Sequence, residues 1–163
     1  VTTEGGLDLE NNFNNIDLAI QKLKENGIEV SLFIDPNNKS IELANMLEAT
    51  WIELHTGSYA NIYAMLYTNL KHTQHSIKEL ELSSDELIEK LNKSLEEIKN
   101  ASNFASNLGL KVAAGHGLNY QNVKNIRNIK EIIELNIGQS IIARSVFTGL
   151  NEAILEMRKI INE

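Results

Sequence analysis

The strongest constraint in this sequence is the alternation of short apolar segments with segments of helical periodicity. The apolar segments are rich in β-branched residues, which is typical of buried strands. Between them, apolar residues recur every three or four positions, which is typical of amphipathic helices. Strands separated by helices run parallel, so the pattern predicts the α/β class, either as an open doubly wound sheet or as part of a barrel. The predicted strands span residues 28–35, 50–55, 110–115 and 132–138.

The length of the chain limits how much of a barrel it can form. A complete (β/α)8 barrel needs about 250 residues, whereas this chain has 163 residues. We therefore expect residues 1–163 to be part of one barrel domain. The chain begins in a predicted loop with no strand before it, so we expect further βα units upstream. The segment 61–84 is long for a βα connection, and we predict an inserted lid or an extra helix there.

The composition argues against several function classes. Fifteen basic and 22 acidic residues give a formal net charge of -7, which repels polyanionic phosphates, so we expect no nucleic-acid partner. The chain has no cysteine, which removes disulfides and thiolate nucleophiles and fits a reducing compartment. No apolar run approaches the roughly 18 residues that cross a bilayer. We expect a cytoplasmic, soluble protein that does not bind membranes.

The strand at 50–55 carries two residues that can do chemistry. Side chains alternate across a strand, so Ile52 and Leu54 share one face while Glu53 and His55 share the other. In a barrel, the apolar face meets the helices and the acid and imidazole point into the lumen, where they can take part in catalysis. The alternative is a buried, hydrogen-bonded pair that holds neighbouring strands together.

A histidine between two glycines follows the next strand. Gly115 and Gly117 let backbone and ligand approach closely, so the imidazole of His116 is a candidate proton donor. The alternative is a structural histidine bonded to loop carbonyl groups.

The loop after the last predicted strand is a candidate phosphate site. Gly138 and Gln139 open a predicted helix whose backbone N–H groups can bind an anion. The alternative is a plain tight turn in which Ser140 caps the helix.

A metal site is the weakest of these hypotheses. His72 and His75 lie one helical turn apart and, with Glu79, have the spacing of a chelate. No matching set of carboxylates and histidines surrounds them, and such spacing is more typical of solvated histidines. We predict no metal site.

Five long segments together point to one known family. They are VTTEGGLDL (1–9), VSLFID (30–35), WIELHTGSYA (51–60), LGLKVAAGHGLNYQNV (108–123) and ELNIGQSIIARSVFTGL (134–150). In order, and nearly in spacing, they resemble the pyridoxine 5′-phosphate synthases. The resemblance covers essentially the whole chain, but only the carboxyl-terminal part of that family.

The resemblance implies a (β/α)8 TIM-type barrel, of which this chain supplies about the last four βα units, assembled into octamers. It implies condensation of 1-deoxy-D-xylulose 5-phosphate with 3-amino-2-oxopropyl phosphate to pyridoxine 5′-phosphate, with release of phosphate and water, in vitamin B6 biosynthesis. The partners it implies are these phosphorylated small molecules and further copies of the protein, and it implies no cofactor and no metal.

The resemblance also assigns roles to residues. His116 corresponds to the family's proton donor and Glu53 to an acid that stabilises the transition state. Thr2 corresponds to a contact for the deoxyxylulose phosphate. The residues that correspond to contacts for the amino-oxopropyl phosphate are Gly117, Gly138 and Gln139. Many relatives have histidine at the last of these positions, so the role expected of Gln139 is a backbone contact. The family's other catalytic histidine and second catalytic glutamate lie on strands that this sequence lacks.

Two alternatives stay open at this point. One is another phosphosugar-handling barrel enzyme, such as an isomerase or aldolase, although no lysine lies at the carboxyl end of a predicted strand to form a Schiff base. The other is a half-barrel that binds phosphoesters, or mediates assembly, without turnover.

Overall fold

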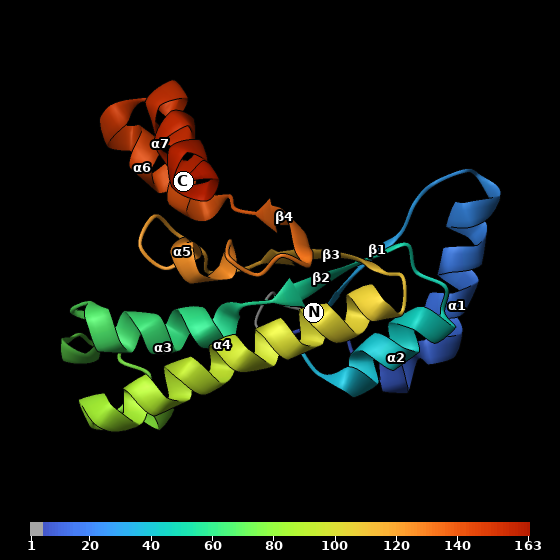
Figure 1. Cartoon of the computed structure of the whole chain (residues 1–163), viewed down its shortest axis with the longest axis horizontal. Helices are drawn as coiled ribbons and strands as arrows, with labels where there is room; N and C mark the ends of the chain where they lie inside the picture. Colours follow the sequence, from blue (N-terminus) through green and yellow to red (C-terminus); the bar gives the residue numbers. More distant parts are fainter. Residues whose placement is uncertain (1–4) are drawn as a thin grey trace.

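A parallel four-stranded sheet forms the centre of the computed structural model, which describes residues 5–163 (Figure 1). The strands lie in chain order, β1-β2-β3-β4, and every neighbouring pair is parallel. They are β1 (Ser31–Ile34), β2 (Trp51–His55), β3 (Lys111–Gly115) and β4 (Ile132–Asn136). Each lies inside one of the predicted segments, so the predicted α/β class is confirmed.

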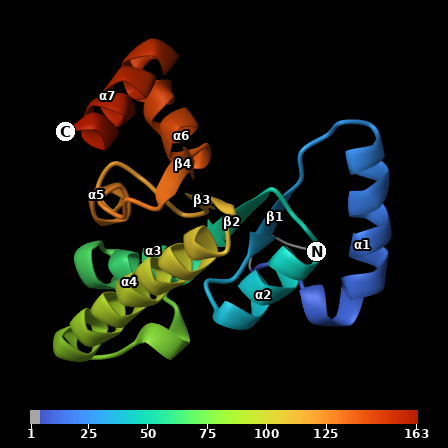
Figure 2. The same ribbon diagram turned by 45° about the vertical axis from the view of Figure 1, so that its right-hand side comes forward.

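Helices connect the strands in the alternation that the sequence predicts. Before β1 lies α1 (Leu9–Glu25), and α2 (Asn38–Met46) joins β1 to β2. Between β2 and β3 lie α3 (Gly57–Tyr67) and α4 (Ser84–Asn107). The remaining helices are α5 (Val123–Ile126), α6 (Gln139–Thr148) and α7 (Leu150–Asn162). Figures 1 and 2 show α2 and α4 side by side along the sheet, with α6 and α7 packed together beyond β4.

The hydrophobic core lies between the sheet and the helices. Ile34, Ile52 and Leu54 are completely buried and alternate with residues that face the other way. Each apolar side chain of this size contributes about 1.5–3 kcal/mol when it is buried. The helices supply apolar partners to the same core, among them Ile41, Ala44, Leu87 and Ile98.

The opposite face of the sheet is polar, as the alternation predicts. One row across the strands pairs Phe33 with Glu53, Ala113 and Glu134. A bulge opposite Val112 and Ala113 leaves Ile133 unpaired and brings Glu134 into this row. The next row pairs His55 with Gly115 and Asn136. Polar groups of β2 and β4 therefore share one face at the carboxyl ends of the strands.

The segment 61–84 contains helix and turns. Residues 61–67 complete α3, which already begins at Gly57. Two 3-10 turns follow, Leu70–His72 and Lys78–Leu80, before Ser83 and Glu86 form a capping box that starts α4. An inserted lid or an extra helix in this segment stays a prediction.

Several large apolar side chains on the β4 side of the sheet are exposed. Phe147 of α6 is 89% exposed and Val146 is 77% exposed. Other exposed apolar side chains on β4, α6 and α7 are those of Ile133, Ile142, Leu150 and Leu155. Within residues 5–163, β1 and β4 each pair on one side only. In this part of the chain, no helix combines the length and apolar character that a membrane span requires.

Candidate active site

Glu53 occupies the centre of the polar face. Its carboxylate accepts a hydrogen bond of 2.7 Å from Asn136 Nδ2 on β4, two strands away. The Glu53 carboxylate lies directly over Gly115 on the intervening strand β3. A Cβ atom at Gly115 would collide with Glu53 Oε1. The absence of a side chain at Gly115 thus makes room for the carboxylate, and Asn136 fixes its position.

His116 lies on a strained loop at the carboxyl end of β3. Its backbone φ is 78°, in a left-handed region that non-glycine residues rarely adopt and that occurs often at functional sites. The buried hydroxyl of Thr56 is shared between two carbonyl oxygens of this loop, at 2.7 Å from Gly115 O and 2.6 Å from His116 O. Thr56, which directly follows β2, therefore fixes the backbone of this loop, and the loop carries the imidazole of His116 at the carboxyl end of the sheet.

The next part of this loop is tied to α3. Asn122 Nδ2 donates to Gly117 O at 3.0 Å, while Asn122 Oδ1 accepts from Asn119 N at 2.8 Å. The Tyr59 hydroxyl on α3 donates to Asn122 O at 2.8 Å. Burial raises the pKa of the Tyr59 phenol, so this group stays a neutral donor. These bonds fix the backbone of Gly117.

An aromatic stack borders His116 on the β2 side. The rings of His55 and His116 have centroids 4.8 Å apart, and Phe33 packs edge-on against His55 at 5.1 Å. His55 Nδ1 lies 3.4 Å from Asp35 Oδ1. Gly57 gives both imidazoles room, since a Cβ atom there would lie 2.7 Å from the His55 ring and 3.0 Å from His116.

A hollow of about 250 Å³ joins the loops after β3 and β4. Its walls include His116, Gly117, Gly138 and Gln139. No side chain caps α6, which begins at Gln139. Ser140 Oγ instead donates to Leu118 O at 2.9 Å, so the alternative in which Ser140 caps this helix is wrong. The first N–H groups of a helix lack partners within the helix, and here they lie beside the hollow.

A larger cavity of about 810 Å³ opens on the other side of His116. Asp35, His55 and Gly57 line it from the sheet side, and Glu79 and Leu80 line it from the turn before α4. The segment 61–84 therefore contributes one wall of the candidate site.

The histidine pair in this segment does not form a metal centre. In the described part of the chain, no three histidine, aspartate or glutamate side chains are placed to hold a metal ion. The chelate that the spacing of His72, His75 and Glu79 allows is therefore not assembled.

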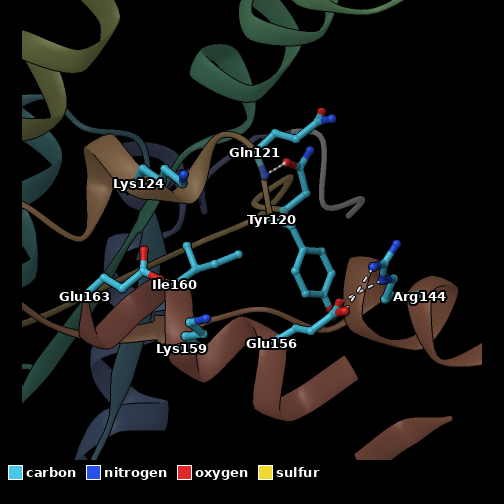
Figure 3. Close-up of a pocket in the computed structure, with 9 residues that line it drawn as sticks. Tyr120, Gln121, Lys124, Arg144, Glu156, Lys159, Ile160 and Glu163 are labelled. Atoms are coloured by element: carbon cyan, nitrogen blue, oxygen red, sulfur yellow. Dashed lines mark hydrogen bonds and ion pairs between the residues drawn. The ribbon is translucent and has the colours of Figure 1, made fainter. Parts of the chain in front are cut away.

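A third cavity, of about 530 Å³, lies outside this site, between the loop after β3 and α7 (Figure 3). Arg144 donates two hydrogen bonds to the Glu156 carboxylate there, one of 2.8 Å from Nε and one of 3.0 Å from Nη2. These bonds hold the pKa of Glu156 below its usual value. No residue that the sequence assigned to the site lines this cavity.

The structure thus brings most of the expected site residues together. His116, Gly117, Gly138 and Gln139 line one hollow, and Asn136, which lines it too, bonds to Glu53. Thr2 lies outside the described residues.

Sequence reasoning missed three supporting residues: Asp35, Thr56 and Asn122. Asp35 had a signal, because it is a polar residue at the carboxyl end of a predicted strand. Thr56 and Asn122 had none, since Thr56 bonds to the loop after β3 and Asn122 to Tyr59 on α3.

Comparison with known proteins gives one consistent result. The family model described as pyridoxal phosphate biosynthesis protein PdxJ matches residues 1–163. The chain is 65% identical over 161 residues to a pyridoxine 5′-phosphate synthase of Aliarcobacter butzleri, 58% identical over 163 residues to one of Nitratiruptor, and 57% identical over 161 residues to one of Campylobacter lari. Each match covers at least 99% of this chain and 62% of the relative. The chain therefore spans about three fifths of the length of these relatives.

Proposed function

Because this chain belongs to the family of the pyridoxal phosphate biosynthesis protein PdxJ, we propose that it supplies the last four βα units of a pyridoxine 5′-phosphate synthase barrel. Four parallel strands in chain order, each followed by helix, are half of the (β/α)8 pattern. The relatives are longer than this chain, and the part of their length that it does not cover accommodates the other βα units of the barrel. In the closed barrel, the polar face of the sheet becomes the lumen.

The proposed reaction condenses 1-deoxy-D-xylulose 5-phosphate with 3-amino-2-oxopropyl phosphate. The product is pyridoxine 5′-phosphate, and phosphate and water are released. In parallel barrels such chemistry takes place at the carboxyl ends of the strands. The polar groups described above gather at that end, which supports this assignment.

His116 is the proposed proton donor. Hydroxide leaves poorly until its oxygen is protonated, and an imidazole titrates close enough to neutrality to supply that proton. The strained loop holds the ring between the larger cavity and the hollow, so it borders both. This position suits transfer to a substrate that extends from one space into the other.

Glu53 is the proposed electrostatic stabiliser. Its carboxylate is fixed on a strand by Asn136 rather than carried on a loop. A prepositioned negative charge stabilises a cationic amine or imine as that charge develops, without reorganisation at the moment of reaction. Glu53 therefore acts on the transition state more than on substrate binding.

The hollow between the two glycine loops is the proposed phosphate site. Gly117, Gly138 and the backbone of Gln139 are the proposed contacts for the amino-oxopropyl phosphate, and Thr2 is the proposed contact for the other substrate. N–H groups at the start of α6 supply donors and a positive helix end. A backbone contact does not need the imidazole that many relatives carry at the position of Gln139.

The wider setting of the enzyme follows from the same family. We propose a cytoplasmic homo-octamer that works without metal or cofactor. The exposed apolar side chains of α6 and α7 provide surface for contacts with the rest of the barrel or with other subunits.

The observation that carries the proposal is the convergence of His116, Glu53 and the glycine-lined hollow at one end of a parallel sheet. The test uses a completed chain, in which these 163 residues are joined to the part of the Aliarcobacter butzleri synthase that they do not cover. We expect it to form pyridoxine 5′-phosphate from the two substrates, as measured by chromatography. A folded completed chain that forms none would refute the assigned function.

Variants of the completed chain test the role of His116. General acid catalysis contributes about 10²- to 10⁴-fold, so His116→Asn should lower kcat by that factor and leave KM within a few fold. His75→Asn makes the same change at an exposed histidine outside the site and should leave kcat unchanged. A wild-type kcat in His116→Asn, with product release shown not to be limiting, would make His116 a structural loop residue.

A further inference from the structure

The wall beside His116 contains two polar side chains in contact that the proposed mechanism does not use. Asp35 follows β1 and His55 ends β2, and their closest polar atoms, Oδ1 and Nδ1, lie 3.4 Å apart. Both side chains line the same cavity as His116. The sequence pattern named His55 only as a general candidate for chemistry, and the family comparison assigned a role to neither residue.

We propose that Asp35 and His55 are positioning residues for proton transfer by His116. In this arrangement Asp35 fixes the His55 ring through its contact with Nδ1, and the His55 ring orients the ring of His116. The inference rests on the proposed function and extends it by two residues.

The first support is that the carboxylate of Asp35 is itself fixed. Asp35 Oδ1 accepts a hydrogen bond of 3.0 Å from Gly6 N, although its side chain is half exposed. The segment before α1 is in turn bonded to β1, since Leu7 N donates to Phe33 O at 2.8 Å. Asp35 is thus held in place as a charged anchor at the mouth of the cavity.

The second support is that the His55 ring has little freedom. The residue is only 8% exposed and packs perpendicular to Phe33. On its other side it contacts His116, with the ring planes inclined by 40°. Asp35 Oδ1 lies 3.4 Å from Nδ1 of this ring, so the ring is in contact with a fixed side chain on this side as well. Here that fixed ring is the surface against which His116 lies.

Asp35→Asn in the completed chain tests the pair. The amide keeps the shape and an oxygen for Gly6 N–H but removes the negative charge. We expect kcat to fall about tenfold and KM to stay within about twofold. Asp17→Asn on α1 makes the same change outside the site and should alter none of these values.

His55→Phe separates ring packing from the Asp35 contact. Phenylalanine keeps an aromatic ring between Phe33 and His116 but has no nitrogen for Asp35. We expect a similar fall in kcat, and no further fall when this change is combined with Asp35→Asn, because both act through one contact. A wild-type kcat in His55→Phe would overturn the proposal.

A structural readout tests the pair without turnover. We expect crystals of the completed chain to show the His55 and His116 rings with centroids about 4.8 Å apart, and crystals of Asp35→Asn to show this arrangement lost. An unchanged arrangement in Asp35→Asn would overturn the proposal even if the enzyme is active. A changed arrangement in Asp35→Asn, together with an inactive wild-type completed chain, would refute only the proposed function.

Discussion

The substitution Gly115→Ala tests most directly how the candidate site is built. A Cβ atom at this position would overlap Glu53 Oε1 and lie 3.0 Å from both Asn136 Cβ and Asn136 O. The strand backbone cannot move aside, because Gly115 pairs with strands on both sides. The Glu53 carboxylate must therefore rotate away and give up its bond from Asn136.

The cost can be estimated from these two effects. A hydrogen bond to a charged group contributes about 1.5–3 kcal/mol, and an extra methyl group in a packed site costs about 1–3 kcal/mol. Glu53 is only partly buried and regains water when it rotates, so we expect a net loss of about 2–4 kcal/mol. For a domain of this size, 1 kcal/mol corresponds to about 2–4 °C, so Tm should fall by about 4–16 °C.

The assay is thermal unfolding of the completed chain, followed by circular dichroism. Gly138→Ala is the matched control, since a Cβ atom there meets nothing within 4 Å and should leave Tm unchanged. Glu53→Ala removes the carboxylate that the new Cβ atom of Gly115→Ala would overlap. In the double variant, Gly115→Ala should therefore lower the free energy of unfolding by only about 1 kcal/mol, from the remaining contacts with Asn136. If Gly115→Ala lowers Tm equally with and without Glu53, the reasoning is wrong.

Three further predictions concern binding, assembly and pH. In crystals of the completed chain grown with phosphate or sulfate, an anion should lie between the loops of Gly117 and Gly138; density for the substrate phosphate far from both loops would contradict this. Expressed alone, the 163-residue chain should self-associate, because its strand edges, polar face and apolar α6–α7 surface are uncovered; a monomer in analytical ultracentrifugation that unfolds in one sharp transition would contradict it. Arg144 lowers the pKa of Glu156 below its usual 4.5, so this pair should stabilise the fold above that pH and lose its effect as the pH falls through the lowered value. The Tm difference between the completed chain and its Glu156→Gln variant should therefore shrink from pH 7 to pH 3, and an unchanged difference would exclude the ion pair as its cause.

The features that could be predicted from the sequence are those that follow from local pattern. Ile52 and Leu54 alternate with Glu53 and His55, and this order alone places the acid on the polar face. The glycine loops could be placed at the carboxyl edge because each follows a recognisable strand.

The features that escaped prediction depend on contacts between segments. Serine is a common capping residue, but the hydroxyl of Ser140 donates to Leu118 O on the loop after β3, so the residue type alone predicted the wrong partner. The bulge at Ile133 puts this isoleucine outside the pairing, although it belongs to an apolar run like the other strands. The Asp35–His55 pair joins the ends of two strands, and no spacing along one segment encodes it.

The order β1-β2-β3-β4 has a consequence for how the chain is made. Each strand finds its partner in the unit synthesised just before it, so no strand has to be threaded between two that already exist. Paired residues of successive strands are 20 positions apart between β1 and β2 and 60 positions apart between β2 and β3, and loop closure over such distances slows folding. As the chain leaves the ribosome, β2 can add to β1, then β3 to β2, and β4 last. The Glu53–Asn136 bond spans 83 positions of sequence and connects β2 to β4, so it can form only when this growth has reached the final strand.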